Sequence, residues 1–277
     1  MSTMQRQIGI MQGRLLPKYF GRYQAHPLGY WQKEFDLAKE LGLYCVEFIL
    51  DYNDAEQNPL LKEDGVDRIL EKVNESGVKV KSICADYFME APLHHRDESV
   101  IKHGQSILNR LITNGKKIGI TDIVIPCVDQ SSLQTEDDVR RFADALHPVI
   151  GHAELNDINL SLETDLNPEA FGRLLEKFPS KKITVNYDTG NSASLGFDPM
   201  EEFNCYGSRI SDIHIKDRKF GGGSVILGTG DTNFENFFQA IKKINFNGPF
   251  IMQVYRDDEG ISVFKQQLDW FTNKYLS

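Results

Sequence analysis

The chain has 277 residues, of which 40% are hydrophobic and 26% are charged, enough apolar material for one large domain. Acidic residues outnumber basic residues 40 to 31, which gives a net charge of −9 with histidine neutral. Because binding to a phosphate backbone depends on clustered lysine and arginine, this balance argues against a nucleic-acid partner. It leaves open a small anionic ligand held by a few local arginines.

The sequence also argues against a membrane partner and a secreted protein. No stretch approaches the roughly 20 apolar residues of a membrane span, and we expect no signal peptide. The four cysteines are scattered without a C-x-x-C pair, and three of them lie in or beside apolar strand-like runs. Cysteine in such a run is typically a small buried hydrophobe. These features predict a reduced, cytoplasmic protein.

Short apolar runs rich in Ile, Val, Phe and Tyr alternate with longer amphipathic stretches along the chain. The short runs have the length and composition of β-strands. Strands are predicted at residues 7–11, 45–50, 78–85, 122–127, 159–163, 184–188, 210–216 and 249–255.

The amphipathic stretches predict helices between the strands. Thr135 is an N-cap residue followed by three acidic residues that suit the helix dipole. Asn167 precedes Pro168, and proline is favoured at the first helical position. Helices are predicted at residues 31–41, 66–74, 100–111, 135–149, 234–244 and 262–275, with another starting at Asn167.

Eight strands alternating with helices over about 250 residues indicate an α/β fold, a (β/α)8 TIM barrel. A doubly wound sheet is the competing fold, but no G-x-G-x-x-G follows the first strand. Gly221-Gly222-Gly223 lacks the Lys-Ser or Lys-Thr of a P-loop. Since no linker or composition break interrupts the chain, we expect a single domain over residues 1–277.

Polar residues lie near the ends of four consecutive predicted strands. Glu163 ends the fifth, Asp188 ends the sixth, and His214 and Gln253 lie in the seventh and eighth. Because the C-terminal ends of barrel strands meet at one rim, these side chains are predicted to meet. Two carboxylates, an imidazole and an amide oxygen suit a divalent cation such as Mn²⁺, Co²⁺, Mg²⁺ or Zn²⁺. Singly, each residue could instead be a solvated, salt-bridged or packing side chain.

These strand ends also resemble a known family. The matching pieces are Ser161-Leu162-Glu163, Asp188-Thr189-Gly190-Asn191, His214-Ile215-Lys216-Asp217, Leu227-Gly228-Thr229-Gly230-Asp231 and Gly248-Pro249-Phe250. With them the chain resembles the xylose isomerase-like TIM-barrel family of sugar and sugar-phosphate isomerases and epimerases. The resemblance implies that Glu163, Asp188 and His214 bind a metal. The family normally has a glutamate where this chain has Gln253, and often a histidine where it has Asn191.

The resemblance further implies proton transfer at the carbon next to a carbonyl, through an enediolate that the metal stabilises. Glu163 is the expected base. Lys216 lies two residues after His214 on a strand, so it points to the same side. We therefore expect Lys216 to contact a substrate oxygen or to neutralise a carboxylate.

The glutamine at position 253 bears on the mechanism. An amide cannot act as a base at ordinary pH, although its oxygen can still bind a cation with one negative charge fewer. We therefore expect weaker metal binding, and a one-base aldose–ketose isomerase is favoured over a two-base epimerase. Epimerisation would need another group, with Glu47 or Asp86 as candidates; second-sphere hydrogen bonding is the alternative role for both.

The substrate is expected to be a small sugar or sugar phosphate. Arg14, Arg218 and Arg256 each follow a predicted strand, and their guanidinium groups could converge on an anionic group. Solvated surface arginine is the alternative. Two segments are candidate walls of the pocket: residues 15–27, which are rich in aromatics and suit a lid, and residues 86–96.

Other functions stay open at this point. A sugar-binding barrel without turnover and a dehydratase of a cyclic hydroxy acid use the same kind of barrel. An abasic-site endonuclease needs more histidine ligands and a basic face, and the −9 charge and seven histidines argue against it. A homodimer is also open, because the aromatics Trp270, Phe271 and Tyr275 could form a subunit contact or close the barrel against its last helix.

Overall fold

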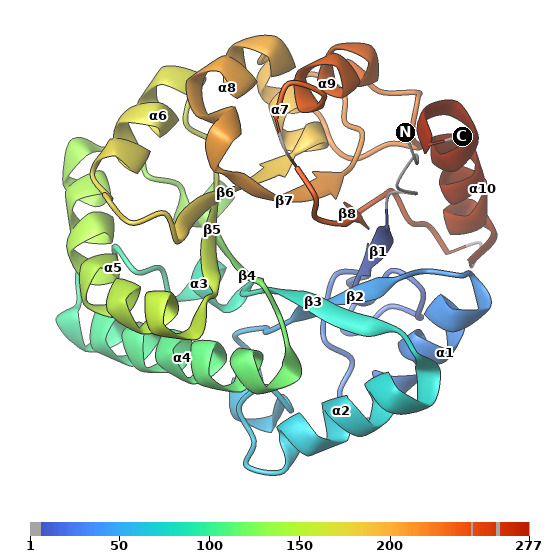
Figure 1. Cartoon of the computed structure of the whole chain (residues 1–277), viewed down its shortest axis with the longest axis horizontal. Helices are drawn as coiled ribbons and strands as arrows, with labels where there is room; N and C mark the ends of the chain where they lie inside the picture. The colour runs from blue at the N-terminus through green and yellow to red at the C-terminus, as the bar shows by residue number, and fades with distance from the viewer. Residues whose placement is uncertain (1–6, 245, 259–260, 277) are drawn as a thin grey trace.

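The computed structural model describes residues 7–244, 246–258 and 261–276. They form a closed barrel of eight parallel strands in sequence order, with helices around the outside (Figure 1). The strands are β1 Ile8–Met11, β2 Cys45–Ile49, β3 Lys79–Cys84, β4 Asp122–Cys127, β5 Asn159–Thr164, β6 Ile183–Asp188, β7 Ile210–Ile215 and β8 Phe250–Met252. Pairing of β1 with β8 closes the ring. The predicted (β/α)8 barrel is confirmed.

The helices are α1 Gln32–Glu40, α2 Gly65–Ser76, α3 Tyr87–Glu90, α4 Glu98–Ile118, α5 Glu136–Asn156, α6 Pro168–Glu176, α7 Thr189–Leu195, α8 Pro199–Tyr206, α9 Phe234–Ile241 and α10 Ile261–Phe271. The predicted cap of α5 is confirmed, since the Thr135 hydroxyl accepts from Asp138 N and the Asp138 carboxylate accepts from Thr135 N. Asn167 likewise caps α6 ahead of Pro168.

Several predicted bounds are wrong for identifiable reasons. Helix α4 does not end at residue 111 but continues through Gly115, whose missing side chain leaves room for Ile120. Helix α5 continues past residue 149 with Pro148 inside it. Strand β8 is shorter than residues 249–255 and ends at Met252. Beyond it the Arg256 Nε donates to the Arg14 carbonyl, 2.7 Å away.

The C-terminal aromatic residues pack inside the chain. Phe271 is fully buried, and the Tyr275 ring stacks on Phe238 of α9 with 4.5 Å between centroids. Trp270 meets the ring of Phe234 edge-on. These three residues therefore help to hold α10 and the segment after it against α9.

Two further observations bear on the sequence predictions. Cys45, Cys84 and Cys127 are buried and Cys205 is exposed, and all four are free thiols. Within the described ranges, none of the helices combines the length and the apolar character needed to cross a membrane.

Candidate metal centre

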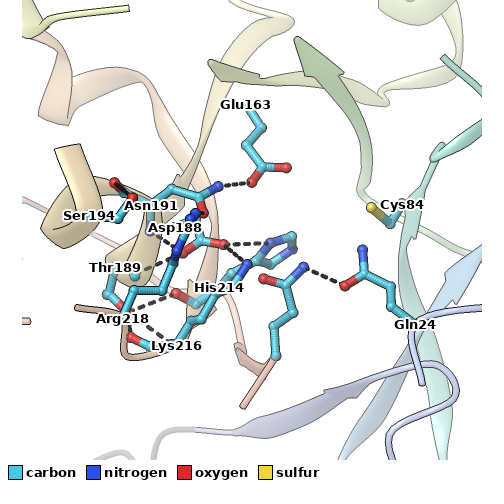
Figure 2. A network of polar contacts seen from close by, with 12 residues as sticks. Gln24, Cys84, Glu163, Asp188, Thr189, Asn191, Ser194, His214, Lys216 and Arg218 are labelled. Atoms are coloured by element: carbon cyan, nitrogen blue, oxygen red, sulfur yellow. Dashed lines mark hydrogen bonds and ion pairs between the residues drawn. The ribbon is translucent and has the colours of Figure 1, made fainter. Parts of the chain in front are cut away.

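Glu163, Asp188 and His214 meet at the C-terminal rim of the barrel, as the strand order predicts. All three side chains are buried, and each offers a ligand atom within 4.8 Å of the others. Figure 2 shows them pointing toward one another from β5, β6 and β7. Two acidic groups held this close in a buried site call for a positive charge between them.

The orientation of His214 leaves one ring nitrogen facing the carboxylates. Its Nε2 lies 2.7 Å from Glu47 Oε1, a hydrogen bond in which the imidazole N–H donates to the carboxylate. In this neutral tautomer Nδ1 carries a lone pair. Nδ1 is buried without a hydrogen-bond partner and lies 4.0 Å from Asp188 Oδ2. The imidazole is thus set up to bind a cation on the Asp188 side.

The carboxylate of Asp188 has one structural oxygen and one oxygen directed to the site. Oδ1 accepts hydrogen bonds from the backbone N–H groups of Gly190 and Asn191, both at 2.8 Å, and so caps α7. Oδ2 lies 3.4 Å from the Lys216 Nζ. The cap therefore fixes the carboxylate so that only Oδ2 remains for a ligand.

Glu163 is held by an amide that an arginine orients. Its Oε1 accepts from Asn191 Nδ2 at 2.7 Å, and Asn191 Oδ1 accepts from Arg218 Nη1 at 2.9 Å (Figure 2). Burial, reinforced by the negative charge of Asp188, raises the pKa of Glu163 to about 7. A divalent cation bound beside this carboxylate would offset the cost of burying its charge.

Gln253 follows β8 directly and contributes a neutral oxygen. The side chain is only 4% exposed, and its Oε1 has no hydrogen-bond partner within the described part of the chain. Its Nε2 donates to Gln24 Oε1 at 2.9 Å. Sequence reasoning missed Gln24, since the only signal was its place in the predicted lid.

These residues fit a divalent cation. Two buried acceptor atoms without partners, His214 Nδ1 and Gln253 Oε1, accompany the carboxylates of Glu163 and Asp188. Two carboxylates, one imidazole and one amide oxygen form a donor set that Mn²⁺, Co²⁺, Mg²⁺ or Zn²⁺ accepts.

A second acidic cluster, Glu47, Asp212 and His214, lies deeper in the barrel. Its carboxylates already accept hydrogen bonds, because Ser82 Oγ donates to Glu47 Oε2 and Asn186 Nδ2 donates to Asp212 Oδ2. Burial raises the pKa of Glu47 to about 7. Glu47 of this cluster orients the His214 ring, so the group formed by Glu163, Asp188 and His214 is the better candidate for a cation.

A cavity of about 610 Å³ is lined by Glu163 and Gln253. Of the residues predicted to contact the substrate or to act in catalysis, Glu163, Asp86, Asn191, Lys216 and Arg218 line it. The predicted walls contribute too, with Tyr23 and Gln24 from the lid segment, and Met89 and Glu90 from helix α3, where a loop was expected.

The other predicted substrate contacts lie elsewhere. Arg256 is 9% exposed and packs over the Tyr23 ring, 4.6 Å from its centroid. Arg14 donates to Gln24, and Glu47 lies behind His214 rather than on the cavity wall. Of the three arginines predicted to converge on an anion, the structure places Arg218 alone against this cavity.

Comparisons with known proteins agree with the barrel fold. Residues 35–274 match the family model described as xylose isomerase-like TIM barrel. The L-ribulose-5-phosphate 3-epimerase UlaE of Salmonella heidelberg (strain SL476) is 27% identical over 237 residues, which cover 82% of this chain and 83% of that protein.

Solved structures share the fold. A D-psicose 3-epimerase superposes with a TM-score of 0.76 at 14% identity, covering 98% of this chain and 100% of the other. The IOLI protein with a binding zinc atom also gives 0.76, at 16% identity, with 98% and 99% covered. An L-ribulose 3-epimerase gives 0.70 at 20% identity, with 95% and 86% covered.

Proposed function

The chain belongs to the xylose isomerase-like TIM barrel family, and from this premise we propose that it is a divalent-metal-dependent isomerase or epimerase of a sugar or sugar phosphate. The observation that carries the proposal is the buried, unpartnered Nδ1 of His214 facing the carboxylates of Glu163 and Asp188. Relatives named as L-ribulose-5-phosphate 3-epimerase and a D-psicose 3-epimerase with the same fold support the substrate class.

In the proposed reaction Glu163 removes the proton from the carbon next to the substrate carbonyl. Asn191 keeps one oxygen of Glu163 engaged and so fixes the direction of the carboxylate. Lys216, which lines the cavity beside Asp188, donates a hydrogen bond to a substrate oxygen on which negative charge develops. A divalent cation held by Glu163, Asp188, His214 and Gln253 would supply Lewis-acid stabilisation of that charge.

The number of proton-transfer groups that line the cavity distinguishes isomerisation from epimerisation. Isomerisation moves one proton along one face of the substrate and needs only Glu163. Epimerisation at C3 needs a second proton-transfer group, which the Gln253 amide cannot be. Asp86 is the candidate for that role because its side chain lines the cavity, whereas Glu47 is bonded to His214 and Ser82 behind it.

The test is proton exchange in D₂O. Protein loaded with Mn²⁺ is incubated with a panel of ketoses and their phosphates, and exchange at C1 and C3 is followed by NMR. We expect exchange that depends on the metal, at C1 for isomerisation or at C3 for epimerisation. Ligand binding without exchange at either carbon, with Mn²⁺ bound, would contradict turnover and favour the sugar-binding barrel that the neutral Gln253 also allows.

A further inference from the structure

We propose that Gln24 is a positioning residue that determines which end of the Gln253 amide faces the metal centre. This inference rests on the proposed function, because it concerns how the chain prepares the fourth metal ligand. Gln24 comes from the segment after β1, and 229 positions separate it from Gln253 in sequence. Figure 2 draws Gln24 together with Glu163, Asp188 and His214, and Gln24 lines the same cavity as Glu163.

Three side chains meet at Gln24. Its Oε1 accepts hydrogen bonds from Gln253 Nε2 at 2.9 Å and from Arg14 Nη2 at 3.1 Å. Its Nε2 donates to Asp86 Oδ2, also at 3.1 Å. The Gln24 amide therefore connects a guanidinium group and a carboxylate to the residue that follows β8.

The charged groups decide the direction of both amides. A guanidinium group only donates hydrogen bonds, and an ionised carboxylate only accepts them. Gln24 must therefore turn its oxygen to Arg14 and its nitrogen to Asp86. Gln253 meets the Gln24 oxygen, so it must present its own nitrogen there. Although burial lowers the pKa of Arg14 to about 10, the guanidinium stays protonated at neutral pH.

The consequence is that Gln253 offers the site an oxygen and not an NH₂ group. Its Oε1 is the buried atom that has no hydrogen-bond partner within the described ranges. If the Gln253 amide turned over, two oxygens would face each other at Gln24 and an N–H donor would point at the cation. Gln24 thereby excludes the amide orientation that repels a metal.

The same contact makes Gln24 and Gln253 a matched pair. A glutamate at 253 would bring a carboxylate oxygen against Gln24 Oε1. Gln24 could not turn over to relieve this contact, because its oxygen would then face Asp86 and its nitrogen would face Arg14. The chain is therefore built for a neutral fourth ligand, and Gln253→Glu alone gains less metal affinity than its added charge suggests.

Calorimetric titration with Mn²⁺ tests this coupling in four proteins: wild type, Gln24→Leu, Gln253→Glu and the double variant. We expect Gln24→Leu to weaken Mn²⁺ binding by about tenfold, the lower end of the effect of removing a group that orients a ligand. We expect Gln253→Glu to strengthen binding at least ~10-fold more in the Gln24→Leu background than in wild type. Gln130→Leu is the matched control, because Gln130 lines the same cavity but donates to Glu90.

Two further measurements make the outcomes distinct. Thermal unfolding checks that each variant is folded, and the visible absorption of bound Co²⁺ reports on the ligand set directly. A wild type that takes up no Mn²⁺ would contradict the proposed function and this inference together. Equal affinity in wild type and Gln24→Leu, or independent effects of the two substitutions, would overturn the inference alone.

Discussion

The two sides of the candidate metal centre, at β5 and at β8, are built on the same plan but end in different chemical groups. On the β5 side, Arg218 orients the Asn191 amide, which donates an N–H to the Glu163 carboxylate. On the β8 side, an arginine orients the Gln24 amide, which presents an oxygen to the Gln253 amide. One side therefore ends in a charged group that can accept a proton.

The β8 side ends in the neutral Gln253 amide, which can bind a cation through its oxygen but cannot accept a proton. Gln253 has no protonation equilibrium near neutral pH, so its contribution is an oxygen in a fixed place. Both sides therefore use a charged residue to orient an amide, and they differ in whether that amide holds a carboxylate or a second amide. The proposed proton chemistry is then concentrated on Glu163.

Removing the base should have the largest effect. In Glu163→Gln both sides of the site end in an amide, and we expect turnover to fall by ~10²–10⁴, the usual value of a positioned proton-transfer group. An oxygen for the metal is kept, so Mn²⁺ binding should persist in weakened form. Glu169→Gln, at an exposed residue of α6, is the control. Turnover within threefold of wild type would show that the base is another residue.

Glu47 orients His214, which lies between the β5 side and the β8 side of the site. Glu47→Gln can place an amide N–H against His214 Nε2, which favours the tautomer with its proton on the wrong nitrogen for the metal. We expect Mn²⁺ affinity to drop by ~10–100-fold, as for other groups that orient a metal-binding histidine. Titration with Mn²⁺ measures this effect. Unchanged affinity would contradict the assignment of Nδ1 as the ligand atom.

Asn191→Leu breaks the β5 side and leaves the β8 side intact. It removes the donor to Glu163 and the acceptor of Arg218. Loss of a hydrogen bond to a charged group corresponds to about tenfold in rate, so we expect kcat to fall by about that factor. Steady-state kinetics should show this fall with Mn²⁺ affinity reduced less than in Gln24→Leu. A larger loss of Mn²⁺ affinity in Asn191→Leu than in Gln24→Leu would mean that Asn191, and not Gln24, is the main support of metal binding.

Tyr23→Phe should have the smallest effect, because it loosens only the segment that carries Gln24. The Tyr23 hydroxyl donates to the Asp257 carbonyl and contacts Asp258 Oδ1. We expect the free energy of unfolding in urea to fall by about 1 kcal/mol. Mn²⁺ affinity should change less than in Gln24→Leu. Tyr52→Phe is the control, because Tyr52 is a partly exposed tyrosine that lines the same cavity as Tyr23. A larger fall in the free energy of unfolding in Tyr52→Phe than in Tyr23→Phe would refute the prediction.

The sequence was sufficient for the barrel and for the meeting of Glu163, Asp188 and His214 at its rim. Strands of a parallel barrel are buried on both faces and appear as apolar runs, and Glu163, Asp188 and His214 are placed by the position at which those runs end. Helix α7, with the sequence Thr-Gly-Asn-Ser-Ala-Ser-Leu, has no apolar periodicity and could not be predicted from it.

Contacts between distant segments were beyond sequence reasoning. Gln24 lies in a loop without a periodic pattern, and its partner is 229 positions away. For Glu47, hydrogen bonding was one of the two roles that the sequence left open, but nothing in the sequence identified His214, 167 positions away, as the partner. Such pairs are fixed by how the strands close into a ring, so a single sequence carries no local signal for them.

We propose that Glu163, Asp188, His214 Nδ1 and Gln253 Oε1 hold a single metal ion. Anomalous scattering from crystals of the wild-type protein soaked in Mn²⁺ tests it most directly. We predict one strong peak, ~2.0–2.6 Å from an atom of each of the four side chains. A peak between Glu47, Asp212 and His214 Nε2, or none at the rim of the barrel, would show that these four side chains do not hold the ion.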